Sequence, residues 1–243
     1  MKARGYFLAA ILLTFVLGVA CAMVGSRFAM AQPKMNIHQA TLEEPNQISP
    51  EISTEELKNL LSASKTVVID ARPEMQYALA HITGAINIGD KEEEYIMKNH
   101  PDKGTLIVLY CNGPYWVRTK RVSEKLVKSG YTNVKRYQLG LPVWRALGNT
   151  VETNLEGFRY VFMNDKTAVF VDARSQEEFK AGTVPGAVNV RRGLHKDQGT
   201  RVIVFGKNAE EARTAAEQIA RAPYYNSSYF AGIFEELKRA GLW

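Results

Sequence analysis

The residues around Cys111 could support nucleophilic chemistry. Cys111 follows an apolar run at 106–110 that is typical of a buried strand, and it precedes a predicted helix at 118–129. In parallel α/β sheets, ligands bind beyond the carboxyl ends of the strands. Unpaired N–H groups and the positive end of the helix dipole favour a thiolate, so the sequence predicts a pKa for Cys111 below the usual value of about 8.5. Cys111 is therefore the candidate catalytic nucleophile.

The loop after Cys111 supplies the candidate binding groups. It consists of Asn112, Gly113, Pro114, Tyr115, Trp116 and Val117, and it ends at Arg118. Gly113 permits a curled backbone with inward N–H groups, which binds anions, and Arg118 adds a fixed positive charge. We therefore expect residues 112–118 to bind an anionic substrate. The alternatives are a buried, inert Cys111 and an Arg118 that only anchors the start of the helix.

The first 31 residues resemble an export signal. Lys2 and Arg4 precede an uncharged run of 19 residues at 6–24, and residues 29–31 (AMA) form a small-residue cleavage site. We expect a signal peptide at 1–31 that is cleaved after residue 31. An uncleaved membrane anchor is the first alternative, and lipidation of Cys21 is the second. Each of these places the protein in the periplasm or otherwise outside the cytoplasm, and an uncleaved anchor would hold it at the inner membrane.

Charge and residue content narrow the classes of function. The net charge is +6, but three basic residues and no acids lie in the first 31 residues, so 28 basic and 25 acidic residues follow, a net +3. This small excess does not indicate a nucleic-acid partner, and we expect membrane contact only through an uncleaved N-terminal segment. Without that segment Cys111 is the only cysteine, which favours a reactive thiol in an oxidising compartment. The histidines show no metal-ligand spacing, so we expect neither a metal nor a cofactor.

The chain contains an internal repeat. Three motifs recur in the same order, at 67–72 and 169–174, at 82–88 and 184–190, and at 106–110 and 201–205. Strands that alternate with helices predict an α/β fold with a mostly parallel sheet flanked by helices in each copy. We therefore expect a linker at 32–47, a first domain at 48–152 and a second domain at 153–243.

The second copy lacks the nucleophile. Gly206 stands where Cys111 stands, and Arg213 follows after the same interval of six residues. Glycine has no side chain that could attack a substrate, so we expect the second domain to be catalytically silent.

Other motif residues suggest structural roles. Asp70 and Arg72 return in the silent copy as Asp172 and Arg174, which argues against a role in catalysis. His81 lies in a Gly-containing turn, and we expect it to stabilise that turn.

Together these motifs resemble the rhodanese family. They are Asp70-Ala71-Arg72, the segment 81–88 (HITGAINI), Cys111 with its loop and Arg118, the segment 130–134 (GYTNV) and Gly140 with Trp144. The resemblance implies two rhodanese-like domains. It also implies that Cys111 accepts sulfane sulfur as a persulfide, with thiosulfate, another small sulfur-containing anion or a protein persulfide as donor and a thiol as acceptor. The usual loop of the family has four residues before its arginine, whereas this loop has six, and the bulky Tyr115 and Trp116 argue against thiosulfate as the donor.

Two other functions remain open from the sequence. Cysteine-dependent phosphatases and arsenate reductases also use an enlarged cysteine loop, although their spacing of five residues is absent here. A non-catalytic binding module is the other, and Trp116 and the silent second domain favour it.

Overall fold

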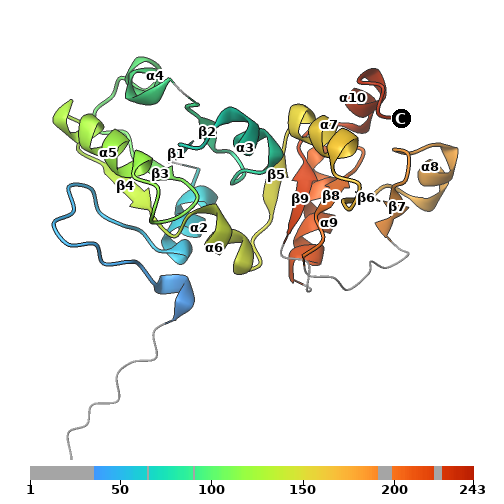
Figure 1. The fold of residues 1–243 in the computed structure, drawn as a ribbon, viewed down its shortest axis with the longest axis horizontal. Coiled ribbons are helices and arrows are strands. Elements are labelled where there is room, and N and C mark those ends of the chain that lie inside the picture. The colour runs from blue at the N-terminus through green and yellow to red at the C-terminus, as the bar shows by residue number, and fades with distance from the viewer. Residues whose placement is uncertain (1–35, 65, 90, 191–198, 222–225) are drawn as a thin grey trace, which may run out of the picture. The chain divides into compact units, whose positions relative to one another are not determined.

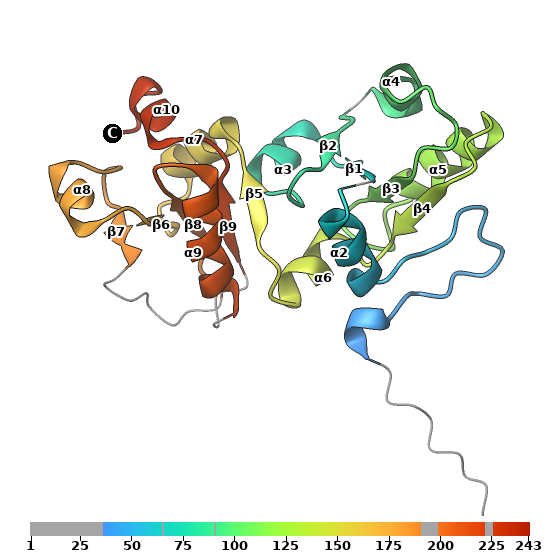
Figure 2. The same cartoon turned by 180° about the vertical axis from the view of Figure 1, so that it is seen from behind.

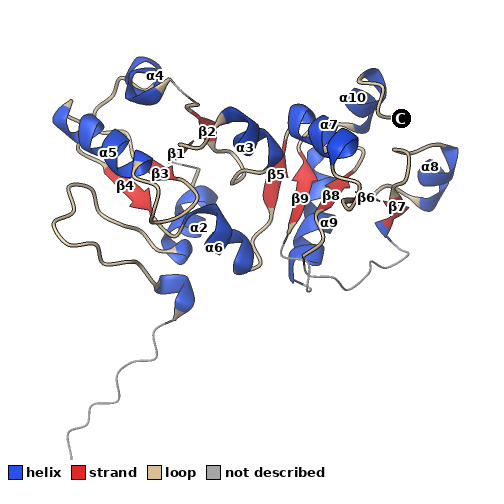
Figure 3. Cartoon of the chain, in the orientation of Figure 1, coloured by secondary structure: helices blue, strands red, loops and turns tan. Residues whose placement is uncertain are grey.

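Helices and strands alternate along the chain, as the sequence pattern predicts (Figure 1; Figure 3). The computed structural model describes residues 36–64, 66–89, 91–190, 199–221 and 226–243. The first half contains η1 (Ile37–Gln39), α2 (Thr54–Ser62), β1 (Val67–Asp70), α3 (Glu74–Leu79), β2 (Ile86–Asn87), α4 (Glu92–Asn99), β3 (Ile107–Tyr110), α5 (Arg118–Lys128), β4 (Val134–Tyr137) and α6 (Gly140–Ala146). The second half contains β5 (Val151–Thr153), α7 (Leu155–Asn164), β6 (Val169–Asp172), α8 (Gln176–Ala181), β7 (Val188–Asn189), β8 (Val202–Phe205), α9 (Ala209–Arg221), β9 (Ser227–Phe230) and α10 (Phe234–Arg239).

The predicted N-terminal signal at 1–31, with Cys21, lies outside the described residues. Across the described ranges, no helix has the length and hydropathy needed to cross a membrane.

The strands form two parallel sheets, which confirms the predicted fold class. The strand order is β2-β1-β3-β4 in the first sheet and β5-β9-β8-β6-β7 in the second. The repeat is preserved in the register, because Asp70 pairs with Tyr110 in the first sheet and Asp172 pairs with Phe205 in the second. The chain therefore contains the same strand arrangement twice.

Helices cover both faces of each sheet (Figure 1; Figure 2). Alternate residues of β1 and β3 pack with α2 and α6 on one face and with α4 and α5 on the other. In the second sheet, α7 and α10 share one apolar cluster with the strands, and α9 packs in the other. The helices bury both faces of each sheet. Functional side chains are therefore expected on the loops at the ends of the strands.

Local sequence determines where α2 and α8 begin. The Ser53 hydroxyl accepts the Glu56 N–H at 3.2 Å, and the Glu56 carboxylate accepts the Ser53 N–H at 2.8 Å. Ser175 and Glu178 repeat this arrangement in the second domain. Each of these helices therefore begins with a capping box.

Part of the predicted linker lies against the first domain. The Glu44 carboxylate accepts hydrogen bonds from Lys120 and Arg136 at 2.7 Å and from Gln138 at 2.9 Å. The donors Lys120 and Arg136 hold the pKa of Glu44 at about 2, below its ordinary value of 4.5, although some burial opposes them. The segment around Glu44 is thus anchored by charge and does not act as a free tether.

Strand β5 joins the two domains. It pairs with β9 of the second sheet, so the predicted boundary between residues 152 and 153 falls inside this strand. On its other side, the backbones of His81 and Glu152 exchange hydrogen bonds of 2.9 and 2.8 Å. Gly157 of α7 approaches the carbonyl of Ala78 in α3 so closely that an added Cβ would lie 2.0 Å from that oxygen. The domains are therefore connected through backbone contacts as well as side chains.

Candidate active site

Cys111 lies at the carboxyl tip of β3, as the sequence predicts. The residue is 3% exposed, and its carbonyl accepts the N–H of Leu141, at the start of α6, at 3.0 Å. The loop that follows leads into α5, which begins at Arg118. The thiol is thus held between the end of a central strand and the starts of two helices.

The loop after Cys111 begins with a turn. Of the predicted binding residues, Asn112 and Gly113 form this turn. Gly113 has a φ of +114°, a backbone conformation that glycine adopts readily, and its carbonyl accepts the N–H of Trp116 at 3.3 Å. The Asn112 side chain donates to Gln76 Oε1 at 2.7 Å, which ties the loop to α3. Asn112 and Gly113 therefore remain beside Cys111, with Gly113 buried.

Gly140 fixes the loop from the other side. Its φ is +69°, and an added Cβ would lie 2.5 Å from both the Cys111 carbonyl oxygen and the Gly113 nitrogen. No side chain fits in this space. The sequence suggests only that Gly140 precedes a helix, so its packing against the cysteine loop is visible only in three dimensions.

The remaining loop side chains point outward. Pro114 is exposed, and Tyr115, Trp116 and Val117 are 95%, 47% and 75% exposed. The structure therefore does not place these four side chains around the thiol, although their backbone still forms the path from Cys111 to α5.

Arg118 connects two loops. Its guanidinium donates to the carbonyl of Gly89, in the loop that follows β2. This contact matches the anchoring role that the sequence left open for Arg118. The positive charge still acts on the site, because it lowers the pKa of the Cys111 thiol.

The predicted direction of the Cys111 pKa shift is wrong. Burial is the largest influence and raises the pKa of the thiol above its ordinary value. The Asn112 N–H, Arg72 and Arg118 favour the thiolate, while the negative charge of Asp70 opposes it. Burial removes solvent from the thiolate, and this cost outweighs the favourable effects of the Asn112 N–H and the two arginines.

A buried ion pair supports the strand that carries Cys111. Arg72 Nε and Nη2 donate to Asp70, with distances from 2.5 to 3.1 Å, and Nη2 also donates to the Ala80 carbonyl. The Tyr110 hydroxyl donates to Asp70 at 2.6 Å and accepts the Ile82 N–H at 3.0 Å. The network agrees with the structural role expected for Asp70 and Arg72, because both are buried and mutually satisfied.

The second domain has the same network, but a different residue donates the hydroxyl hydrogen bond to the aspartate. Arg174 pairs with Asp172 at 2.6 Å, but Phe205 replaces the tyrosine and cannot donate. The Thr183 hydroxyl donates to Asp172 at 2.7 Å instead. Thr183 occupies the place of His81 in the repeat, so a substitution at one motif position supplies the donor lost at another.

His81 has a wider structural role than a turn residue. Its ring stacks on Tyr77 with centroids 3.7 Å apart, and Nδ1 lies 2.8 Å from the Tyr77 carbonyl. Nε2 lies 3.3 Å from the Glu152 carboxylate across the domain junction. Although burial alone would raise the pKa of Glu152, its contacts with His81 and Tyr229 hold it below the ordinary value.

The loop of the second domain that matches the Cys111 loop is occupied by the carboxylate of Glu211. Gly206 is buried, and an added Cβ there would lie 2.8 Å from Glu211 Oε2. Glu211 accepts the Lys207 N–H at 2.7 Å, so a carboxylate occupies the start of this loop. Arg213 turns away to Glu217 at 2.9 Å. The loop therefore offers neither a nucleophile nor an open anion site.

Candidate metal ligands are scattered. Across the described ranges, no three His, Cys, Asp or Glu side chains gather closely enough to hold a metal ion.

Comparison with known proteins identifies the class of the chain. The profile described as Rhodanese-like domain matches residues 53–147 and 161–240. The two matches cover more than half of the chain, and the chain belongs to the rhodanese family.

Among curated relatives, the tRNA uridine(34) hydroxylase of Staphylococcus epidermidis is 31% identical over 140 residues, which cover 54% of this chain and 43% of the relative. The protein of the same name from Streptococcus thermophilus is 29% identical over 133 residues, which cover 50% of this chain and 38% of the relative. The chain thus spans less than half the length of these relatives.

Solved structures with similar folds include sulfurtransferases. A thiosulfate sulfurtransferase from Pseudomonas aeruginosa aligns with 80% of this chain and 43% of its own, at 20% identity and a TM-score of 0.39. A rhodanese from E. coli, solved with anions, aligns with 32% of this chain and 88% of its own, at 37% identity and a TM-score of 0.28.

Proposed function

We propose that the first domain is a sulfurtransferase that carries sulfane sulfur as a persulfide on Cys111. The observation that carries the proposal is the position of Cys111 at the tip of β3, before a turn through Gly113 and the start of α5. The second domain has the same strands but has Gly206 at the matching position. One domain therefore supplies the chemistry and the other supports it.

The transfer has two displacement steps. In the first, the Cys111 thiolate attacks the terminal sulfur of the donor, a sulfur–sulfur bond forms on Cys111, and the donor's bond to that sulfur breaks with the electron pair leaving on the donor. In the second, a thiolate acceptor attacks the outer sulfur and takes it, and Cys111 leaves as a thiolate. Neither step needs a cofactor, because the sulfur moves without a net change in electron count on the protein.

The burial of Cys111 shapes the choice of donor. The residue is 3% exposed, so a donor must be small or must present its sulfur on a narrow end. Backbone N–H groups near Asn112 and the charge of Arg118 favour an anionic sulfur. We infer a small sulfur-containing anion or a persulfide at the end of a protein side chain as the donor, and a thiol as the acceptor.

We also propose that the protein is exported. The basic start, the apolar run at 6–24 and the small residues at 29–31 support this proposal. The export proposal is tested by measuring the mass of the protein purified from the organism that produces it. A mature chain that begins at residue 32 is expected, and an intact N-terminus in a cytoplasmic fraction would contradict export.

The sulfur-transfer proposal is tested by mass spectrometry. The full chain is incubated with thiosulfate, with glutathione persulfide or with a protein persulfide, and Cys111 is expected to gain about 32 Da, the mass of one sulfur atom. Peptide mapping separates Cys111 from Cys21, and Cys111→Ser and Cys21→Ser are the paired variants. The gain should vanish in Cys111→Ser alone, and a Cys111 that stays unmodified by every donor would overturn the proposal.

A binding function of the exposed loop is a second candidate. Tyr115 and Trp116 expose aromatic surface on the loop that follows Cys111, and such side chains often anchor protein partners. A cellular phenotype that survives Cys111→Ser but is lost in the double variant Tyr115→Ala, Trp116→Ala would favour this candidate. The reverse pattern would exclude it.

A further inference from the structure

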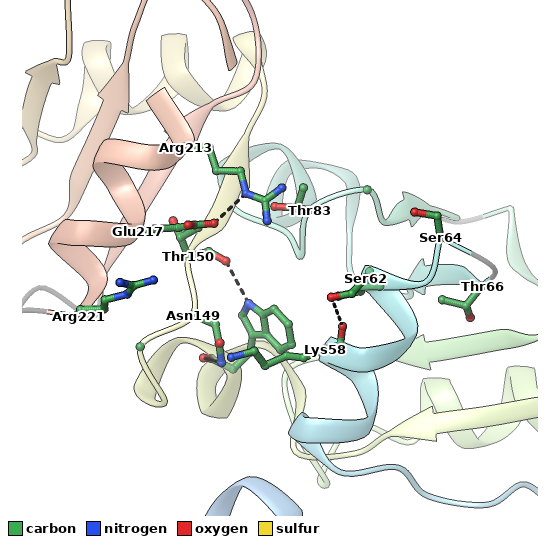
Figure 4. Close-up of a pocket in the computed structure, with 14 residues that line it drawn as sticks. Lys58, Ser62, Ser64, Thr66, Thr83, Asn149, Thr150, Arg213, Glu217 and Arg221 are labelled. Atoms are coloured by element: carbon green, nitrogen blue, oxygen red, sulfur yellow. Dashed lines mark hydrogen bonds and ion pairs between the residues drawn. The ribbon is translucent and has the colours of Figure 1, made fainter. Parts of the chain in front are cut away.

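A cavity of about 630 Å³ lies between the two domains (Figure 4). Its size falls within the range of small-molecule sites. Figure 4 shows Arg213, Glu217 and Arg221 of α9 on one side, and Lys58 and Ser62 of α2 on the other. The two domains therefore build this cavity jointly.

The cavity is separate from the cysteine loop. Thr66 lies directly before β1, and Thr83 and Gly84 lie before β2, so these lining residues mark the amino ends of the strands. Cys111 follows β3, which runs parallel to β1. Because the carboxyl and amino ends of parallel strands lie at opposite edges of a sheet, a ligand in the cavity would not reach the thiol.

The charges of the lining favour an anion. Lys58, Arg213 and Arg221 contribute three positive charges and Glu217 one negative charge, a net +2. Glu217 is already paired with Arg213 at 2.9 Å. Within the described part of the chain, neither Lys58 nor Arg221 forms an ion pair. Two cations from different domains thus face the same space without an ion-pair partner among the described residues.

The cavity also contains a buried hydroxyl without a partner. Thr150 is 8% exposed, and its Oγ1 has no hydrogen-bond partner among the described residues. The adjacent Trp144 is fixed by donation from Nε1 to the Thr150 carbonyl at 3.0 Å, and with Leu61 it gives the lining an apolar side. A buried hydroxyl is costly to leave unsatisfied, so Thr150 is suited to bond a ligand.

We propose that this cavity binds a small phosphate compound, with the phosphate oxygens facing Lys58 and Arg221. The Thr150 hydroxyl, which has no partner among the described residues, provides a neutral hydrogen bond, and the Trp144 side accommodates an organic group. Phosphate carries the charge and the several acceptor oxygens that two cations and a hydroxyl can satisfy together. The site does not depend on sulfur transfer at Cys111.

Isothermal titration calorimetry on the full chain tests the proposal. The probes are inorganic phosphate, adenosine monophosphate as a phosphate ester, and adenosine as its uncharged counterpart. Lys58→Gln and Arg221→Gln should each weaken binding of the phosphate probe about tenfold, because each removes a charge-assisted contact. Lys128→Gln removes an exposed charge at the end of α5 and should leave binding unchanged.

The outcomes separate the possible ligands. Tighter binding of adenosine monophosphate than of inorganic phosphate would identify a phosphate ester, and equal binding would identify free phosphate. Equal affinity for adenosine, the same loss in Lys128→Gln as in Lys58→Gln, or no heat with either phosphate probe would overturn the proposal. Persulfide formation on Cys111 is measured separately, so failure here leaves the proposed sulfur transfer unaffected.

Discussion

The close approach of Gly140 to the cysteine loop makes a quantitative prediction. In Gly140→Ala, the new Cβ would lie 2.5 Å from the Cys111 carbonyl oxygen and from the Gly113 nitrogen. Both atoms belong to the backbone, so no side-chain rotation can relieve the contact. Either α6 or the loop must move, and a movement of the loop displaces Cys111.

The expected cost has two parts. A side chain at a φ of +69° costs about 1–2 kcal/mol. Overpacking against fixed atoms adds about 1–3 kcal/mol. We therefore expect Gly140→Ala to lower the free energy of unfolding by about 2–5 kcal/mol, a large part of the stability of about 5–15 kcal/mol that is typical of a domain.

Gly130 provides the matched control. Its φ is +90°, but an added Cβ there would meet nothing within 4 Å. Gly130→Ala should show only the backbone cost of about 1–2 kcal/mol and normal persulfide formation. Urea unfolding measures the stability, and mass spectrometry measures the rate of Cys111 persulfide formation. Equal losses of stability in the two variants, with unchanged rates in both, would refute the close-packing argument.

Three further predictions follow from individual contacts. Glu44→Gln removes an acid whose pKa of about 2 lies below 4.5, so the wild type should be more stable by about 1 kcal/mol above pH 4.5 and lose this advantage as the pH falls toward 2. Urea unfolding across pH measures the difference, and a pH-independent gap would contradict ion pairing as its source. Tyr110→Phe and Thr183→Val each remove a hydroxyl donor from a buried aspartate, and each should lower the unfolding free energy by about 1–3 kcal/mol. If equilibrium unfolding shows no loss of stability for Thr183→Val, Thr183 does not replace Tyr110 as the donor to the aspartate. Because burial raises the pKa of Cys111, its alkylation by iodoacetamide should be slow near neutral pH and should still accelerate above pH 9.0. A rate that levels off below that pH would show a stabilised thiolate instead.

The arrangement of elements could be predicted because its causes are local and repeated. Apolar runs identify β1, β3 and β8, and the shared VVIDAR and VFVDAR motifs align the two sheets in the same register. The capping residues Ser53 and Glu56 are three residues apart in one turn. The position of Cys111 follows from the same local pattern, since it directly succeeds a buried strand.

The surroundings of Cys111 could not be predicted in the same way. The pKa of the thiol depends on how completely the folded chain excludes water from it, and Gly140, which packs against the cysteine loop, lies 29 residues away in the chain. Arg118 bonds a carbonyl at Gly89, which is equally remote in sequence. A local sequence pattern predicts that a helix dipole lowers the pKa of the thiol. It does not predict the burial that raises this pKa.

The connection through β5 has a consequence for how the protein can be divided. The repeated sequence suggests two independent halves, yet β5 completes the second sheet while Glu152 bonds the backbone of His81 in the first half. At the same junction, Gly157 lies so close to the Ala78 carbonyl that no side chain fits at position 157. A cut near residue 152 would expose an unpaired sheet edge on one fragment and orphaned backbone groups on the other. The sequence that was duplicated is therefore smaller than the piece of chain that we expect to unfold as one cooperative unit, and expression of either half alone should yield an unstable or aggregating fragment.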